Sequence, residues 1–344
     1  MQEPKTGMSF VTKRTTVLFA LGGSLLLGMI VAASIGAMPI SPLSMLQGDL
    51  SAGHQAVLAT IRLPRVVLTV LVGAALAVSG AAMQGLFRNP LADPGLIGIS
   101  SGAALAVAVV IVVAGPASGV FGLYGLSIAA FAGGMITCMV IFRIARISSK
   151  AASVAYMLLA GIAINALAGA ATGFLTFVSD DQQLRTLTFW TMGSLGQALW
   201  PLIAVVASVV IPAVILLICN ARQLNIMLLG EQEAQHLGVN SERLKKLIVV
   251  CTALSVGAAV AASGIIAFVG LIVPHLIRLA IGPDHRILLP ASALAGAVLL
   301  LAADTVARTI VAPAEMPVGI VTSLIGGPFF LWFFVRQSNQ META

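Results

Sequence analysis

Charged residues are scarce in this chain, making up only 9% of its 344 residues, whereas 59% are hydrophobic. Soluble domains are about 25% charged. A chain so poor in charge cannot cover a water-facing surface, so the composition predicts an integral membrane protein. The net charge of +6 does not indicate a nucleic-acid partner, because the basic residues are not clustered on one domain. We therefore expect membrane lipid around a single domain spanning residues 1–344.

Cysteines and catalytic motifs are also few. The three cysteines, Cys138, Cys219 and Cys251, each lie alone in an apolar run and are expected to be buried small residues. Four scattered histidines form no cluster, so no metal site is predicted. The nucleotide-binding pattern G-x-x-x-x-G-K-[ST] and hydrolase motifs do not occur. The chain is therefore expected not to be an enzyme, and to hold no cofactor itself.

Long apolar runs are abundant. A helix needs about 20 apolar residues to cross a bilayer. Ser263 and Gly264 are expected to form a tight reversal between two runs that no hydrophilic loop separates. An all-α protein of ten membrane helices follows, with predicted spans 15–37, 64–86, 95–114, 120–143, 153–178, 199–219, 244–262, 264–281, 288–307 and 318–335.

The distribution of Lys and Arg predicts how these helices are oriented. If the N-terminus is cytoplasmic, all of the 18 basic residues fall on inner segments except Arg62, Arg65, Arg185 and Arg308. Cytoplasmic loops of membrane proteins carry an excess of positive charge. Both termini are therefore expected in the cytoplasm.

A faint internal repeat is consistent with this layout. Val72–Gly80 reads VGAALAVSG and Val256–Gly264 reads VGAAVAASG. The two segments fall in predicted spans that run in opposite directions. Chance similarity between Ala/Gly-rich helices is one explanation. The other is an inverted-topology repeat, which is common in transporters.

Few ionisable residues lie within the apolar runs, and the main exception is Asp304, one helical turn from Arg308. Carriers driven by ion gradients usually have several buried ionisable groups.

The fifth span places Gly161, Asn165, Gly169 and Gly173 on one helical stripe. Small residues at this spacing permit close packing. The stripe indicates packing within one subunit, a dimer seam or a helix that lines a pathway.

The arginines of the outer segments have two interpretations. Arg62, Arg65 and Arg308 either extend to the membrane interface or form a docking patch for an acidic soluble partner.

The largest polar feature is a cytoplasmic island at residues 228–246. Glu231–Leu237 has helix-forming composition, Gly238 is a natural helix stop, and Asn240 or Ser241 is suited to cap the next helix. Ala234, Leu237 and Val239 are expected to form a small apolar knob that fits a groove on a soluble partner. The alternative is a solvated connector.

Five motifs resemble one family across the chain. They are RLPR at Arg62–Arg65, SGAAMQGLFRNPLADPGLIGISSGA at Ser79–Ala103, LGEQEAQHLGV at Leu229–Val239, GIIAFVGLIVPHLIRL at Gly264–Leu279 and PVGIVTSLIGGPFFLWFF at Pro317–Phe334. The sequence resembles permease subunits of the iron-chelate, haem and cobalamin class of ATP-binding-cassette importers (FecCD type).

This resemblance implies a homodimer in the bacterial inner membrane, with the translocation path on its two-fold axis. Two cytoplasmic ATPase subunits, which bind ATP and Mg²⁺, would dock on a coupling region at residues 228–243. The implied contacts are Glu231, Ala234, Gln235, Leu237, Gly238 and Val239. A periplasmic substrate-binding protein would dock through Arg62, Arg65 and, matched less closely, Arg308.

The cargo is indicated less directly. The segment Asp181–Leu195 is most similar to the haem-import branch, while ferric siderophores and cobalamin remain alternatives. A secondary transporter, a membrane enzyme and a receptor without transport are the rivals from other classes.

Overall fold

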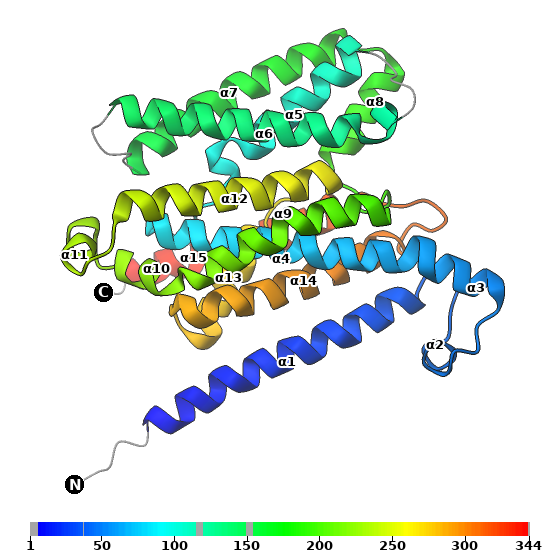
Figure 1. Ribbon diagram of the computed structural model, residues 1–344, viewed down its shortest axis with the longest axis horizontal. Coiled ribbons are helices and arrows are strands. Elements are labelled where there is room, and N and C mark those ends of the chain that lie inside the picture. Colours follow the sequence, from blue (N-terminus) through cyan, green and yellow to red (C-terminus); the bar gives the residue numbers. More distant parts are fainter. Residues whose placement is uncertain (1–5, 37, 115–119, 149–153, 343–344) are drawn as a thin grey trace.

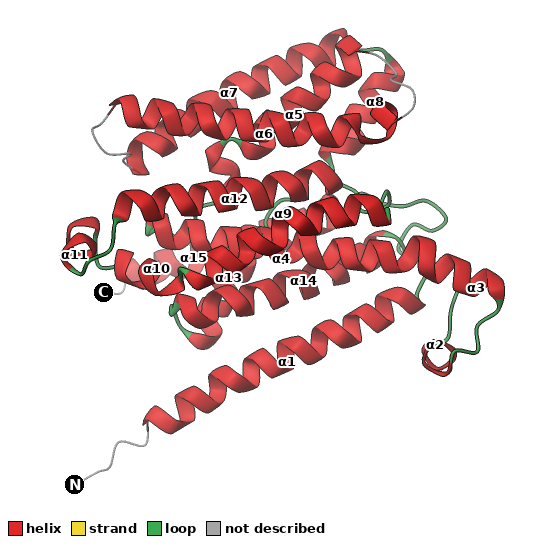
Figure 2. Ribbon diagram, viewed as in Figure 1, coloured by secondary structure: helices red, strands yellow, loops and turns green. Residues whose placement is uncertain are grey.

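The chain is built from helices. The computed structural model describes residues 6–36, 38–114, 120–148 and 154–342, and these residues form helices joined by short loops, without strands (Figure 2). An all-α fold is confirmed. The α-helices are α1 (Thr6–Ser34), α2 (Pro42–Gln47), α3 (Ala52–Val57), α4 (Leu63–Phe87), α5 (Ile99–Val109), α6 (Val120–Ser148), α7 (Val154–Val178), α8 (Asp181–Thr191), α9 (Trp200–Cys219), α10 (Ala221–Met227), α11 (Glu231–His236), α12 (Ser241–Ser263), α13 (Val269–Ile281), α14 (His285–Ala307) and α15 (Val318–Glu342).

Seven helical segments within the described residues are long and apolar enough to cross a membrane. They are Lys13–Ser34, Ala52–Phe87, Tyr124–Ile147, Ala155–Val178, Trp200–Cys219, Ser241–Ser263 and His285–Ala307. Three shorter apolar helices, Ile99–Ala114, Val269–Ile281 and Val318–Phe333, fall on the three remaining predicted spans. At about 1.5 Å per residue, α13 is shorter than the hydrocarbon core of a bilayer.

Helix α4 lies at the centre of the bundle and is buried over nearly its whole length. It packs against α14, α13, α12 and α9. A Cβ atom on Gly73 would overlap the backbone of Gly296 in α14, and one on Gly80 would overlap Gly270 in α13. The glycines therefore allow α4 to approach both helices closely, which is the packing role of small residues in membrane bundles.

The two halves of the chain pack in a corresponding way. Helix α4 of the first half contacts α13 and α14, while α12 of the second half contacts α5 and α6. Figure 1 shows α5, α6 and α7 on one side of α12, with α4 and α14 on its other side. The repeated sequences lie in α4 and at the end of α12. These contacts are consistent with an inverted repeat, which stays a prediction.

The reversal after α12 lies where the sequence predicts it, but it is longer than expected. Helix α12 ends at Ser263, and Gly264 has a φ of +68°, a backbone conformation that favours glycine. The next helix does not begin at residue 264 but at Val269. The residues between pack against the turn after α8, where the Ser194 N–H donates to the Ser263 carbonyl at 2.7 Å.

The residue before a proline is usually extended. The chain instead reaches Pro64 as a helix, because α3 continues through a π-helical turn, Leu58–Arg62, into α4. The Leu63 N–H donates to the Leu58 carbonyl, and Pro64, which has no N–H to donate, follows directly after this π-helical turn. A second correction concerns Cys219, which is exposed at the end of α9, whereas Cys138 and Cys251 are buried.

Candidate functional sites at the two ends of the bundle

The elements that carry the two predicted sites, α11 and the start of α4, lie at opposite ends of the bundle (Figure 1). Helix α11 projects at one end, where α1 begins and α15 ends. The arginines at the start of α4 lie at the other end, near α2 and α3. The geometry therefore separates the predicted coupling region from the predicted docking patch by the full length of the bundle.

Helix α11 is a short helix bounded by two glycines. Gly230 has a φ of +131° and Gly238 a φ of +82°. At the end of α11 the Val239 N–H donates to the Ala234 carbonyl, and the Gly238 N–H donates to the Gln235 carbonyl, both at 2.9 Å. This paired termination requires a left-handed residue, which Gly238 provides. Gly238 is therefore the helix stop that its sequence indicates.

The predicted apolar knob is wrong in part. Ala234 and Val239 are buried against the bundle, so they cannot meet a partner directly. Leu237 is 60% exposed. Leu237 is therefore the apolar part of an exposed surface that also contains Gln232, Glu233, Gln235, His236 and Gly238.

A buried lysine, which the sequence analysis did not single out, fastens α11 to α12. The Lys245 side chain is 1% exposed, and its Nζ lies 2.7 Å from Glu231 Oε1 and 2.8 Å from Glu242 Oε1. Ser241 Oγ donates to Glu231 at 3.3 Å and accepts from Gln235 Nε2 at 2.9 Å. Both ends of α11 are thus bonded to the first turn of α12.

Asp284, at the same end, connects three helices. Its Oδ1 accepts from Asn225 of α10 at 2.7 Å and from the Arg286 N–H at 3.1 Å, and its Oδ2 lies 3.5 Å from Arg14 of α1. Burial by itself would raise the pKa of Asp284, but these hydrogen bonds and cations together lower it. The carboxylate therefore remains charged while it holds α1 and α10 beside the start of α14.

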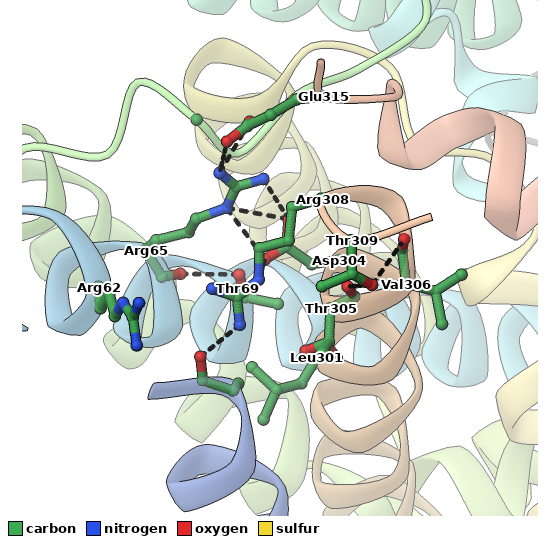
Figure 3. A network of polar contacts seen from close by, with 12 residues as sticks. Arg62, Arg65, Thr69, Leu301, Asp304, Thr305, Val306, Arg308, Thr309 and Glu315 are labelled. Atoms are coloured by element: carbon green, nitrogen blue, oxygen red, sulfur yellow. Dashed lines mark hydrogen bonds and ion pairs between the residues drawn. The ribbon is translucent and has the colours of Figure 1, made fainter. Parts of the chain in front are cut away.

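Arg65 is the centre of the opposite group (Figure 3). Its Nε donates to Asp304 Oδ1 and Oδ2 at 3.1 and 3.0 Å, and its Nη2 donates to Oδ1 at 2.9 Å. Its Nη1 donates to both carboxylate oxygens of Glu315, at 2.9 and 2.8 Å. The guanidinium thus lies between a carboxylate of α14 and one of the α14–α15 connection.

The other two arginines are bonded to the backbone of α1 and the residues after it. Arg62 Nη1 donates to the Ala33 and Ser34 carbonyls at 2.6 and 2.8 Å, and Arg308 Nη2 donates to the Ala32 carbonyl. Arg62 and Arg65 are buried, and the Arg308 side chain is only 8% exposed. The three arginines are therefore bonded within the bundle rather than extended at its surface, and a docking role at this end stays a prediction.

The predicted pair of Asp304 and Arg308 is only a secondary contact. Arg308 Nε lies 3.9 Å from Asp304 Oδ2, whereas Arg65 is the close partner. Asp304 and Arg65 are 239 residues apart, so no local pattern indicates their pairing.

The predicted stripe of α7 divides into two parts. Gly161 is buried, and Asn165 bonds to Ser101 and to the Gly95 carbonyl. Gly169 and Gly173 are exposed, and a Cβ atom added to either meets nothing within 4 Å. The structure brings Asn165 against α5 and leaves the two later glycines without a packing partner in the described chain. A path or dimer seam along α7 stays a prediction.

The described residues contain no group of three His, Cys, Asp or Glu residues that could hold a metal ion. Their chemistry is instead that of ion pairs at both ends of an apolar bundle. The long apolar helices are those of a multi-pass membrane protein.

The sequence profile of the FecCD transport family matches residues 24–336, and the chain belongs to this family. It is 53% identical over 323 residues to the hemin transport system permease protein HmuU of Yersinia pestis, covering 93% of this chain and 96% of that protein. It is 44% identical over 296 residues to the cobalamin import system permease protein BtuC of Halobacterium salinarum, covering 86% and 78%.

A solved structure has the same fold. A metal-chelate type ABC transporter in an inward-facing conformation matches with a TM-score of 0.84 and 33% sequence identity, covering 94% of this chain and 99% of that one. The likeness therefore extends over nearly the whole chain.

Proposed function

We propose that this chain is the permease subunit of an ATP-driven importer that carries haem into the cytoplasm by alternating access, in the bacterial inner membrane. The observation that carries the proposal is the 53% identity to a hemin permease, because it extends over 93% of the chain. The similarity to cobalamin permeases favours cobalamin as the alternative cargo. A ferric siderophore is a further alternative on sequence resemblance.

The proposed topology has ten membrane helices and two cytoplasmic termini. The seven long helices and three shorter apolar ones support ten crossings or partial crossings. The positive-inside distribution supports a cytoplasmic position for α11. The arginines Arg62, Arg65 and Arg308 then lie at the periplasmic end.

The energy source in this proposal is a separate ATPase that holds ATP and Mg²⁺. Two such subunits would bind the α11 turn, with Leu237, Gln235 and Gly238 at the contact. Glu231, Ala234 and Val239 would then support the turn from behind. Because Lys245 connects Glu231 to α12, movement of α11 would be passed into a membrane helix that packs against α4, α5, α6 and α9.

A second copy of the chain is proposed to complete the pathway. The face of α7 that carries Gly169 and Gly173 also exposes Phe174 and Phe177. In a homodimer this face would lie at the seam or beside the path. A periplasmic binding protein would deliver cargo at the arginine end.

The cargo is tested by reconstituting the permease with its ATPase and binding protein in liposomes. Haem, ferric siderophore and cobalamin are supplied separately on the binding protein's side, and accumulation inside is measured with ATP on the ATPase side. We expect haem to accumulate fastest. Faster uptake of cobalamin or siderophore would reassign the cargo, and no ATP-dependent uptake of any of them would refute the proposed function.

A further inference from the structure

We propose that Glu315 is a built-in competitor for the docking arginine: it occupies, on Arg65, the place that an acidic side chain of the binding protein takes. Docking is then an exchange of one carboxylate for another. This inference rests on the proposed function, because it requires a soluble protein that docks at this end. It goes further by assigning a role in setting docking affinity to a residue of this chain.

The two carboxylates on Arg65 differ in how replaceable they are. Asp304 is buried in α14 and bonds the Nε and Nη2 side of the guanidinium. Removing it would leave the buried Nε and Nη2 groups of Arg65 without an acceptor, which is costly. Glu315 bonds only Nη1, with both of its oxygens, and its side chain is 50% exposed. Asp304 is therefore the permanent partner and Glu315 the replaceable one.

The surroundings of Glu315 hold its backbone in place and leave its side chain accessible. The next residue, Met316, donates its N–H to the Ala307 carbonyl at 3.0 Å, and the Val318 N–H donates to the Gly193 carbonyl at 3.1 Å. A Cβ atom on Gly196 would lie 3.2 Å from Glu315 Oε2. Glycine at that position leaves room beside the carboxylate, so the side chain can leave Arg65 without rearrangement of its loop.

The chemistry of the site specifies a carboxylate as the incoming group. The planar guanidinium fork matches the two oxygens of a carboxylate, and this is the geometry in which Glu315 already binds. The group as a whole contains three guanidiniums, of Arg62, Arg65 and Arg308, and two carboxylates, of Asp304 and Glu315. Its excess positive charge attracts an acidic surface, and Glu315 reduces that excess.

The proposed exchange predicts that substituting Glu315 strengthens docking. Replacing Glu315 with Gln removes the competing charge and frees the Nη1 side of Arg65, so an acidic partner binds more tightly. Exposed ion pairs contribute little, so the expected gain is about two- to fivefold in Kd. A residue that only supported the fold would give the opposite result, because its loss would weaken docking.

The test measures the Kd between the permease in nanodiscs and the purified binding protein that supports uptake in the reconstituted system. Glu315→Gln is compared with wild type and with Asp49→Asn, which removes another exposed carboxylate near the same end. We expect Glu315→Gln to tighten binding at low salt, the gain to shrink at high salt, and Asp49→Asn to have no comparable effect. In an Arg65→Met/Asp304→Asn background, Glu315→Gln should have no effect.

Unchanged or weaker binding by Glu315→Gln, with unfolding temperature unaltered, would overturn the proposal. An equal gain from Asp49→Asn would also overturn it, because a general change in surface charge would then be the cause. If wild type transports its cargo normally while either result is obtained, the proposed function stands and only this inference fails. If wild type neither binds the protein nor transports, the proposed function fails first.

Discussion

At the scale of single residues, buried charged side chains connect neighbouring helices, as Lys245 connects α11 and α12. The Lys245 side chain is 1% exposed, and its ammonium group contacts Glu231 and Glu242. A buried cation is stable only when opposite charges meet it. Because both carboxylates are partly exposed, solvent weakens each pair. The contact therefore adds little stability but restrains α11, because Glu231 cannot move away unless Lys245 moves with it or loses this ion pair.

Replacing Lys245 with Met should release α11 from α12 while retaining most of the packing of the lysine stem. We expect amide hydrogen exchange in residues 231–239 to become about tenfold faster, as loss of one charge-assisted hydrogen bond implies. ATP hydrolysis by the assembled importer should continue with less cargo moved per ATP.

The matched control is Lys246→Met, which changes the neighbouring, exposed lysine. It should leave both hydrogen exchange and coupling near wild type. If Lys245→Met kept wild-type exchange and a wild-type ratio of cargo to ATP, the connection between Glu231 and Lys245 would have no role in coupling.

The sequence predicts local features such as helix caps and stops but not contacts between residues far apart in the chain. The stop at Gly238 and the cap at Asn240, whose side chain accepts from the Arg243 N–H, are local and follow from residue type. The bond between Arg65 and Asp304 joins helices far apart in the chain, so the sequence could present both residues but not their pairing. The same limit explains why the sequence does not predict that the arginines bond within the bundle.

At the scale of helices, glycine determines which surfaces touch. Gly80 of α4 lies directly against the backbone of Gly270, whereas Gly169 of α7 faces open space. Both residues are helical, and Ala favours a helix over Gly by about 1 kcal/mol. The two positions should therefore respond oppositely to the same substitution.

Gly80→Ala should destabilise the bundle by about 1–3 kcal/mol, because the added methyl forces α4 and α13 apart. Gly169→Ala should be neutral or slightly stabilising in a single subunit. Thermal unfolding in detergent measures both. Equal losses of stability would contradict the close approach of α4 to α13.

Gly169→Leu would test the proposed dimer seam by measuring subunit assembly and transport activity.

Helix lengths and boundaries follow largely from apolar runs and their polar ends, and each predicted span falls on an observed apolar helix. Helix α8 and the π-helical turn before α4 were not foreseen. Helix α8 begins with a capping box between Asp180 and Gln183, a local signal that could have indicated it. The π-helical turn has no comparable local signature.

At the scale of the whole molecule, the two halves exchange partners, so that α4 and α12 occupy corresponding positions. Polar groups gather at the two ends of the bundle, while exposed apolar side chains cover helices such as α1, α7 and α15. Lipid or a second subunit is therefore needed around these helices. If the proposed ATPase contact is at α11, its movement would pass through α12 to the centre of the bundle.

In the proposed function, transport through this chain is driven by an ATPase acting on α11. The most direct measurement is haem accumulation in sealed liposomes holding permease, ATPase and binding protein, with ATP, with a non-hydrolysable analogue, or with an imposed ion gradient and no ATP. We predict accumulation only with ATP, unaffected by an uncoupler. Accumulation that proceeds without ATP and collapses with the uncoupler would contradict the account and identify a secondary transporter.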